Sequence, residues 1–283
     1  MLDRYVLRRL FQRDKLQRVF VERLTEPLHL NVLAAFVWLF GSFRMRVAFD
    51  LVVRQQYAFS ILHSAERAKE FGKQGVTIVE FGVASGAGLL NMCKIAENAS
   101  KSTGVEFRVF GFDTGTGLPP PHDYRDYPEA YREGDFPMDV DRLRAALPSF
   151  ATLVIGDIED TVPIFLDNLS LQHPIGFIAI DVDYYSSSKK TMAAFCGSAN
   201  KYLPRVIVYL DDIGDEYCSP WTGELLAIHE FNREQPARKI APFTMLRSRR
   251  IFKSARWLDQ VFVAHIHDHE LRSVEHIRGG ASV

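Results

Sequence analysis

Short apolar runs that alternate with helical patterns constrain the fold of this chain more than any other feature. After Gly75 the sequence repeatedly forms short apolar runs that end at turn residues, which is typical of buried strands. These runs are residues 76–81, 107–112, 151–156, 175–180 and 205–210. Helical patterns at 89–101, 187–202 and 223–233 separate most of them. The alternation predicts an α/β fold, a doubly wound and mostly parallel sheet with helices on both faces.

The first 72 residues are predicted to be helical instead. Apolar positions recur at helical spacing from Val47 to Phe71, and Gly72 is a suitable stop. Residues 28–43 form an earlier apolar run without a charged side chain, which falls short of the length of a membrane span. We expect a helix that is buried or covers a neighbouring subunit in a homo-oligomer; the alternatives are an interfacial membrane helix or a span. The expected division is a helical extension at 1–72 and an α/β domain at 73–283.

Composition excludes several classes of protein. An apolar content of 47% is too high for a disordered chain, and a net charge of −1 gives no general attraction for nucleic acid. The three cysteines, Cys93, Cys196 and Cys218, form no CxxC pair, which argues against a disulfide scaffold or a cysteine-ligated zinc site. A cytoplasmic protein fits this cysteine usage best.

A glycine-rich turn follows the first predicted strand. The sequence EFGVASGAG at residues 80–88 leads directly into a helical pattern, where glycines allow a tight turn and close approach of a ligand. Its spacing matches neither the dinucleotide fingerprint nor a P-loop. Glu80 stands two residues before Gly82, and a carboxylate there suits a cationic or hydroxyl-bearing ligand better than a pyrophosphate. Alternatively, the glycines only allow the helix to pack closely on the strand.

Acidic residues also end the second and third predicted strands. Asp113 follows the second strand, where an acid can accept both hydroxyls of a ribose. The Gly156-Asp157 pair follows the third strand, where the turn can border an adenine. For Asp113 the alternative is a helix cap or a turn aspartate.

Four further aspartates follow the fourth and fifth predicted strands. Asp181 and Asp183 come after residues 175–180, and Asp211 and Asp212 come after residues 205–210. If these strands are neighbours, their carboxylates crowd one edge of the sheet and favour a hard cation such as Mg²⁺. Residues two apart in a strand share a face, so one of Asp181 and Asp183 could bind the metal while the other acts as a base. The alternative is that Asp211 and Asp212 cap a turn.

Two other stretches stand out. Residues 115–138 are too polar and too rich in proline for a core element, and we expect them to cover the site. His265, His267 and His269 alternate in a strand-like run at 260–267 and just beyond it. They suggest a second metal site, solvated histidines at a strand end, or a histidine that reaches into the active site.

Taken together, these motifs resemble the class I S-adenosylmethionine-dependent methyltransferases, in particular the macrocin O-methyltransferase-like family that modifies sugars. The resemblance rests on VEFGVASGAG, GFDTGTGLP, GDIEDTVP, IDVDYYSSSKKT and YLDDIGD, which span residues 79 to 215, about half of the chain. It implies a Rossmann-like methyltransferase fold over residues 73–283. It also implies that Glu80, Gly82 and Gly86 contact the methionine part of the cofactor, Asp113 its ribose, and the Gly156-Asp157 turn its adenine. Asp181, Asp211 and Asp212 match the magnesium ligands, and Asp183 matches the general base.

The expected function is Mg²⁺-dependent transfer of a methyl group from S-adenosylmethionine to a hydroxyl of a small acceptor. A vicinal diol or catechol is favoured, because chelation of two neighbouring oxygens by the ion lowers the pKa of the hydroxyl. The sequence leaves two alternatives open: a metal-dependent hydroxylase or hydrolase on the same scaffold, and a non-catalytic cofactor-binding partner in an assembly.

Overall fold

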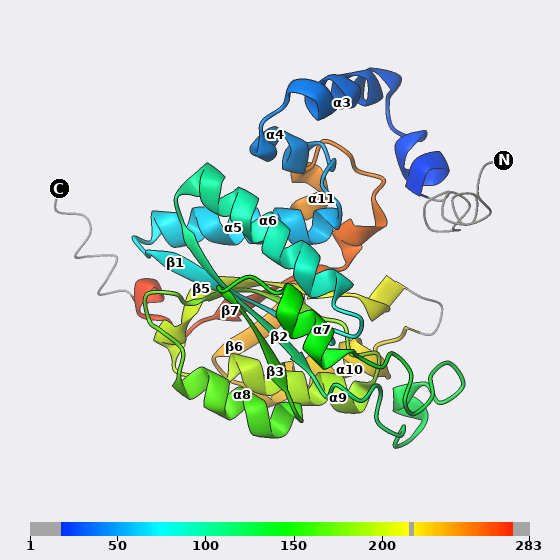
Figure 1. Ribbon diagram of the computed structural model, residues 1–283, viewed down its shortest axis with the longest axis vertical. Coiled ribbons are helices and arrows are strands. Elements are labelled where there is room, and N and C mark those ends of the chain that lie inside the picture. Colours follow the sequence, from blue (N-terminus) through cyan, green and yellow to red (C-terminus); the bar gives the residue numbers. More distant parts are fainter. Residues whose placement is uncertain (1–17, 215–217, 274–283) are drawn as a thin grey trace.

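A seven-stranded sheet forms the centre of the protein (Figure 1). The computed structural model describes residues 18–214 and 218–273. The strand order is β3-β2-β1-β4-β5-β7-β6; the first five strands of the chain run parallel, and β7 runs antiparallel to both of its neighbours. The strands are β1 Gly75–Phe81, β2 Glu106–Asp113, β3 Ala151–Ile155, β4 Ile175–Ile180, β5 Tyr202–Leu210, β6 Arg238–Pro242 and β7 Val261–Ile266. The prediction of a doubly wound, mostly parallel, Rossmann-like sheet is confirmed.

Helices cover both faces of the sheet, as its apolar strands require (Figure 1). Every residue of β1 and β4 is buried, so these central strands need cover on each side. One face packs against α5 Gln55–Glu70, α6 Ala87–Thr103, α7 Val140–Ala146 and α11 Leu246–Arg249. The other face packs against α8 Ile158–Asp167, α10 Gly223–Glu234 and the short helical turns after α9 Tyr185–Thr191. The crossover from β3 to β4 passes to the other side of β1, which creates a switch point at the carboxyl ends of β1 and β4.

The N-terminal helices differ from the expectation in two respects. The prediction of a continuous helix over 47–71 is wrong. The chain forms α4 Phe43–Ala48, leaves the helical conformation at 49–54, and then forms α5. Asp50 and Arg54 adopt left-handed backbone conformations in the break, and the buried Asp50 carboxylate pairs with Arg250. This long-range ion pair overrides the local helical pattern. The 1–72 boundary remains a prediction, and α5 itself packs on β1, β4 and β5.

The apolar run at 28–43 forms α3 Leu28–Phe40, but this helix is not buried in the chain. Only Ala34 and Val37 are buried, and seven large apolar side chains of α3 are exposed. The expectation of a helix buried within the protein is therefore wrong, whereas cover by a neighbouring subunit is untested. Among the described residues, no helix is both long and apolar enough to cross a membrane.

Two other elements differ from the sequence-based expectation. The helix predicted over 187–202 is interrupted: α9 is followed by two 3-10 turns, Met192–Phe195 and Ala199–Lys201, and β5 begins at Tyr202. The strand predicted at 260–267 is β7, while α7, α8 and β6 were not anticipated.

Candidate active site

The glycine turn lies at the switch point, between the end of β1 and the start of α6. Gly82 has a φ of 82°, and a Cβ added there would stand 1.5 Å from the carbonyl oxygen of Asp181. Only glycine fits this contact between the turn and the end of β4. Gly86 has a φ of 83° and forms the N-cap of α6. A Cβ at Gly88 would stand 2.2 Å from Oε1 of Glu80, so close helix–strand packing is part of the reason for this glycine.

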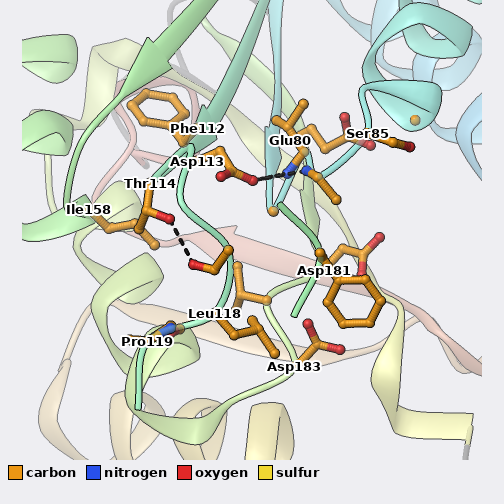
Figure 2. A pocket seen from close by; sticks show the side chains of 18 of the residues that line it. Glu80, Ser85, Phe112, Asp113, Thr114, Leu118, Pro119, Ile158, Asp181 and Asp183 are labelled. Carbon is orange, nitrogen blue, oxygen red and sulfur yellow. Dashed lines mark hydrogen bonds between the residues drawn. The ribbon is translucent and has the colours of Figure 1, made fainter. Parts of the chain in front are cut away.

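The turn forms one wall of a pocket (Figure 2). The opposite walls come from the segments after β2, β3 and β4, and from the start of α5. The lining includes Gly82, Val83, Ala84, Ser85, Asp113, Thr114, Leu118, Pro119, Gly156, Ile158, Asp181, Asp183, Arg54 and Glu80. Gly86 is absent from the lining, so its role in the described structure is to cap α6. The pocket thus lies where a doubly wound sheet places its ligands.

Glu80 is a buried acid at the base of this pocket. Its exposed fraction is 1%, and its Oε1 accepts a hydrogen bond from the Tyr57 hydroxyl at 2.7 Å. Oε2 has no hydrogen-bond partner within the described chain. Burial raises the pKa of Glu80 to about 7, although the hydrogen bond from Tyr57 and the charge of Arg54 oppose the shift. An orphaned carboxylate oxygen of this kind fits a cationic ligand group.

Asp113 connects the two turns that border the pocket. Its Oδ2 accepts hydrogen bonds from the backbone N–H groups of Val83 and Ala84, each at 2.9 Å, and its Oδ1 accepts one from Gly115 at 2.7 Å. Asp113 is therefore a turn aspartate, which was the alternative to a ribose-binding residue. The side chain also lines the pocket, and Oδ1, which accepts only one of these bonds, has a second lone pair that can accept from a hydroxyl (Figure 2). The contact with a ribose stays a prediction.

Asp157 has a different position from the one expected. Its Oδ1 accepts from the backbone N–H of Glu159 at 2.8 Å and so caps α8, and its Oδ2 pairs with Nζ of Lys190 at 2.6 Å. These contacts lower the pKa of Asp157, the bond from Lys190 most of all. The Asp157 side chain does not line the pocket; Gly156 and Ile158 form that edge instead.

Three aspartates meet at the ends of β4 and β5, which are adjacent and parallel as predicted. Asp181, Asp211 and Asp212 each offer one carboxylate oxygen within 4.8 Å of the others. Burial, followed by repulsion from Asp211 and Asp212, raises the pKa of Asp181 well above its usual value. Crowded, partly buried oxygen ligands of this kind fit a hard divalent ion such as Mg²⁺, and the guanidinium of Arg54 is a positive charge that interacts with Asp181 and Asp211. The three predicted metal ligands are therefore brought together.

Asp183 lines the same pocket. The direction of its side chain does not come from strand alternation, contrary to the prediction. The strand ends at Ile180 and Asp183 has a left-handed φ of 57°, so strand alternation does not determine its direction. Its backbone N–H donates to Oδ2 of Asp212 at 3.0 Å. Burial raises the pKa of the Asp183 carboxyl to about 6, against the effect of a hydrogen bond from Tyr131. A carboxylate with this pKa can accept a proton near neutral pH.

Sequence reasoning missed three residues of the site. Arg54 caps α5 in a left-handed conformation and lines the pocket; burial would lower its pKa, but the negative groups around it raise it overall. Tyr57 donates to Glu80 from the first turn of α5. Glu224, in the first turn of α10, is 3% exposed with no hydrogen-bond partner for either oxygen in the described chain. Burial and the aspartate cluster raise the pKa of Glu224 well above its usual value.

Residues 115–138 cover part of the pocket, as expected, with Leu118, Pro119 and Phe136 in the lining. A buried side chain, Asp126, fixes this cover to the start of α9. It accepts hydrogen bonds from the backbone N–H of Ser186 at 2.8 Å, from the Ser186 hydroxyl at 3.0 Å, and from the backbone N–H of His122 at 2.9 Å.

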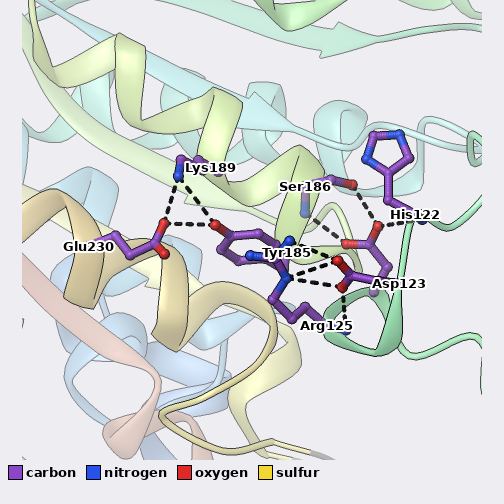
Figure 3. A network of polar contacts seen from close by, with 8 residues as sticks. His122, Asp123, Arg125, Tyr185, Ser186, Lys189 and Glu230 are labelled. Atoms are coloured by element: carbon purple, nitrogen blue, oxygen red, sulfur yellow. Dashed lines mark hydrogen bonds and ion pairs between the residues drawn. The ribbon is translucent and has the colours of Figure 1, made fainter.

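A second set of polar contacts ties the same cover to α10 (Figure 3). The Arg125 guanidinium lies 4.5 Å from the centre of the Tyr185 ring, and the Tyr185 hydroxyl donates to Glu230 at 2.7 Å. Lys189 also donates to Glu230, at 2.8 Å. The cover is therefore fixed to both α9 and α10.

The histidines lie at the opposite edge of the sheet. Because β7 is antiparallel to β5, His265 pairs with Arg205 near the start of β5, far along the strand from Asp211. The rings of His265 and His267 stack, and His269 contacts the Tyr202 carbonyl. The hypothesis that one of them reaches into the active site is wrong. Within the described residues, the aspartate cluster is the only group with metal-ligand geometry.

No family model and no curated protein matches this sequence. Solved structures with a similar chain path include CalS11, a calicheamicin methyltransferase, at 24% identity over 63% of this chain and 72% of that chain, with a TM-score of 0.47. Another is the O-methyltransferase TomG from Streptomyces achromogenes, at 13% identity over 76% of this chain and 81% of that chain, with a TM-score of 0.40.

Proposed function

We propose that this chain is a Mg²⁺-dependent O-methyltransferase that transfers the methyl group of S-adenosylmethionine to a hydroxyl of a small polyhydroxylated acceptor. One observation carries the proposal: Asp181 belongs both to the pocket behind the glycine turn and to the cluster of three carboxylates. A donor held in that pocket and an acceptor held at that cluster would therefore be neighbours.

On the donor side, the residues present fit a sulfonium cofactor. The unpartnered Oε2 of Glu80 would bind the cationic amino group of the cofactor's methionine part. Asp113 faces the same pocket and would accept from the ribose, while Gly156 and Ile158 would border the adenine. Leu118 and Phe136 add apolar side chains to the lining and would keep water away from the transferred methyl group. A water-poor pocket favours this transfer because charge disappears between the sulfonium and an alkoxide.

On the acceptor side, Asp181, Asp211 and Asp212 would hold the ion. When bound, S-adenosylmethionine supplies an electrophilic methyl group and Mg²⁺ lowers the pKa of a coordinated hydroxyl. Asp183 would then take the hydroxyl proton, a contribution of roughly 10²–10⁴-fold in rate. Since an ion with three protein ligands has room for two more oxygens, a vicinal diol, as in sugars and catechols, is the favoured acceptor.

The test is a screen of sugars, catechols and glycosides with labelled S-adenosylmethionine, with EDTA and with Mg²⁺ restored. We expect turnover of a diol that EDTA abolishes and Mg²⁺ restores. The Asp212→Asn variant should lose Mg²⁺ affinity by calorimetry, whereas Asp141→Asn, a change of an exposed aspartate on α7, should behave like the original. Turnover that survives both EDTA and Asp212→Asn, with unchanged Mg²⁺ affinity, would contradict the metal assignment.

A further inference from the structure

Helix α3 presents an unusually apolar surface to its surroundings. Its exposed large side chains are Leu28, Val32, Leu33, Phe36, Trp38, Leu39 and Phe40. Leu28 and Phe40 are 78% and 72% exposed. A soluble monomer rarely shows a continuous apolar patch larger than a few hundred Å², and such patches mark interaction sites.

The shape of this surface indicates what can cover it. At about 100° per residue, the exposed apolar positions extend from Trp38 to Leu33 over about 220° of the circumference of the helix. A helix that packs on one neighbour shows a stripe of about 100°. In Figure 1, α3 lies at an extremity of the molecule, beyond α4 and away from the sheet. One partner helix would cover only part of this apolar surface. The hydrocarbon of a lipid bilayer can cover all of it, because lipid chains adapt to the shape of the helix.

Basic side chains surround the base of this helix. Exposed cations come from α4, from the end of α11 and from the segment after it: Arg46, Arg249, Lys253 and Arg256. Hydrogen bonds place these segments beside the start of α3, because the Glu26 carboxylate accepts from the backbone N–H groups of Lys253 and Ser254, and Arg250 donates to the Val47 carbonyl.

The acids in the same region are buried, bonded to backbone N–H groups, or paired with other cations, as Asp259 is with Arg247 and Glu66 with Arg44. Glu26 is buried beneath residues 253 and 254, Asp50 is buried against Arg250, and Glu22 accepts from the backbone N–H of Arg256. The surface around α3 is therefore cationic.

We propose that α3 and its basic rim, Arg46, Arg249, Lys253 and Arg256, form a docking surface for an anionic lipid bilayer. The helix has 13 residues and a length of about 20 Å, too short to cross a hydrocarbon core of about 30 Å. It would lie in the interface, with its aromatic side chains below the headgroups and the rim against the phosphates. A second copy of the chain is the competing occupant, but a two-fold contact would bring two cationic rims together.

The test is flotation of the full chain with vesicles of phosphatidylcholine, with and without phosphatidylglycerol. We expect flotation with the anionic vesicles, weakening as salt rises. The combined change Phe36→Ser, Trp38→Ser and Phe40→Ser should reduce binding at least about tenfold. These side chains are exposed, so the variant should keep its circular dichroism and melting temperature. The control, Trp221→Ser, removes an equally exposed tryptophan far from α3 in the sequence and should bind normally.

A second variant tests the electrostatic part. Arg46→Glu with Arg249→Glu should weaken binding to anionic vesicles about tenfold and remove most of the salt dependence. Absence of flotation, or equal binding by the serine variant and the original, would overturn the proposal. So would light scattering that shows a stable dimer which the serine changes dissociate, if that dimer does not bind vesicles.

Discussion

Replacing Glu80 with glutamine tests whether a cofactor binds in this pocket, because binding should release a proton from the Glu80 carboxyl. In the free protein, burial holds the pKa of Glu80 at about 7, compared with 4.5 for an ordinary glutamate. A cationic amino group placed against the unpartnered Oε2 would favour the ionised form and return the pKa toward its ordinary value. Binding of S-adenosylhomocysteine, which carries the same amino group, should therefore release a proton from Glu80.

The size of the effect follows from the two pKa values. A group with a pKa of about 7 is about 0.9 protonated at pH 6 and about 0.1 protonated at pH 8, so these are the protons released per ligand bound. Affinity should then increase about tenfold between pH 6 and pH 8. A complete return of the Glu80 pKa from about 7 to 4.5 corresponds to about 3 kcal/mol of coupling between the ligand's charge and the carboxylate.

Titration calorimetry in buffers of different ionisation enthalpy measures the released protons directly. Glu80→Gln should bind more weakly at pH 8, release no proton and show no pH dependence between pH 6 and pH 8. Tyr57→Phe should move the midpoint of proton release to higher pH, because the hydrogen bond from Tyr57 supports the ionised carboxylate. If the original releases no proton at pH 6, or if Glu80→Gln keeps the pH dependence, the amino group does not bind at Glu80.

Three further outcomes are expected. The pKa of Glu80 is higher in the folded protein than in the unfolded chain, so the folded protein binds the extra proton. Ionisation of Glu80 should therefore lower the free energy of unfolding by up to about 3 kcal/mol as the pH rises from 4.5 to 7. Urea titrations should show a smaller decrease for Glu80→Gln. Gly82→Ala should cost more than about 3 kcal/mol by the same titrations, since its Cβ meets a backbone oxygen, whereas Gly104→Ala, also left-handed but in open space, should cost about 1 kcal/mol. Asp126→Ala should lower stability by about 2 kcal/mol and speed proteolysis within residues 115–138. Glu129→Ala, which removes an exposed acid of the same segment, should change neither; equal cleavage of the two variants would show that Asp126 does not hold the cover.

The predictable part of the structure is the part that local sequence determines. Each of the five parallel strands is an apolar run with a turn at its end. Asp113 is the last residue of β2, and Asp181 and Asp211 directly follow β4 and β5. Parallel strands align their carboxyl ends, so the position in sequence alone places the acids at one edge. Helix α8 was missed because Pro163 interrupts its pattern, although the Asp157 cap with acids after it was a signal.

The unpredicted part depends on contacts between distant segments. Arg54 reaches the pocket because the chain breaks at 49–54, and that break accompanies an ion pair between Asp50 and Arg250, 200 residues apart. Glu224 and Tyr57 each stand alone in the first turn of a helix, with no motif around them. Their polar character carries no local signal of function, since most such residues are solvated.

The two halves of the proposed site are joined by the sheet itself rather than by mobile loops. The backbone N–H of Asp181 donates to the carbonyl of Phe81 at 2.9 Å, which continues the pairing of β1 with β4 past the end of the strands. One residue further along, Gly82 touches the Asp181 carbonyl. The turn that would hold the donor and the first ligand of the ion are thus fixed to each other by one hydrogen bond and one close contact. Orientation of two reactants can supply roughly 7–11 kcal/mol of a barrier. A rigid connection of this kind would secure that contribution before the acceptor binds, and it leaves the choice of acceptor to the cover.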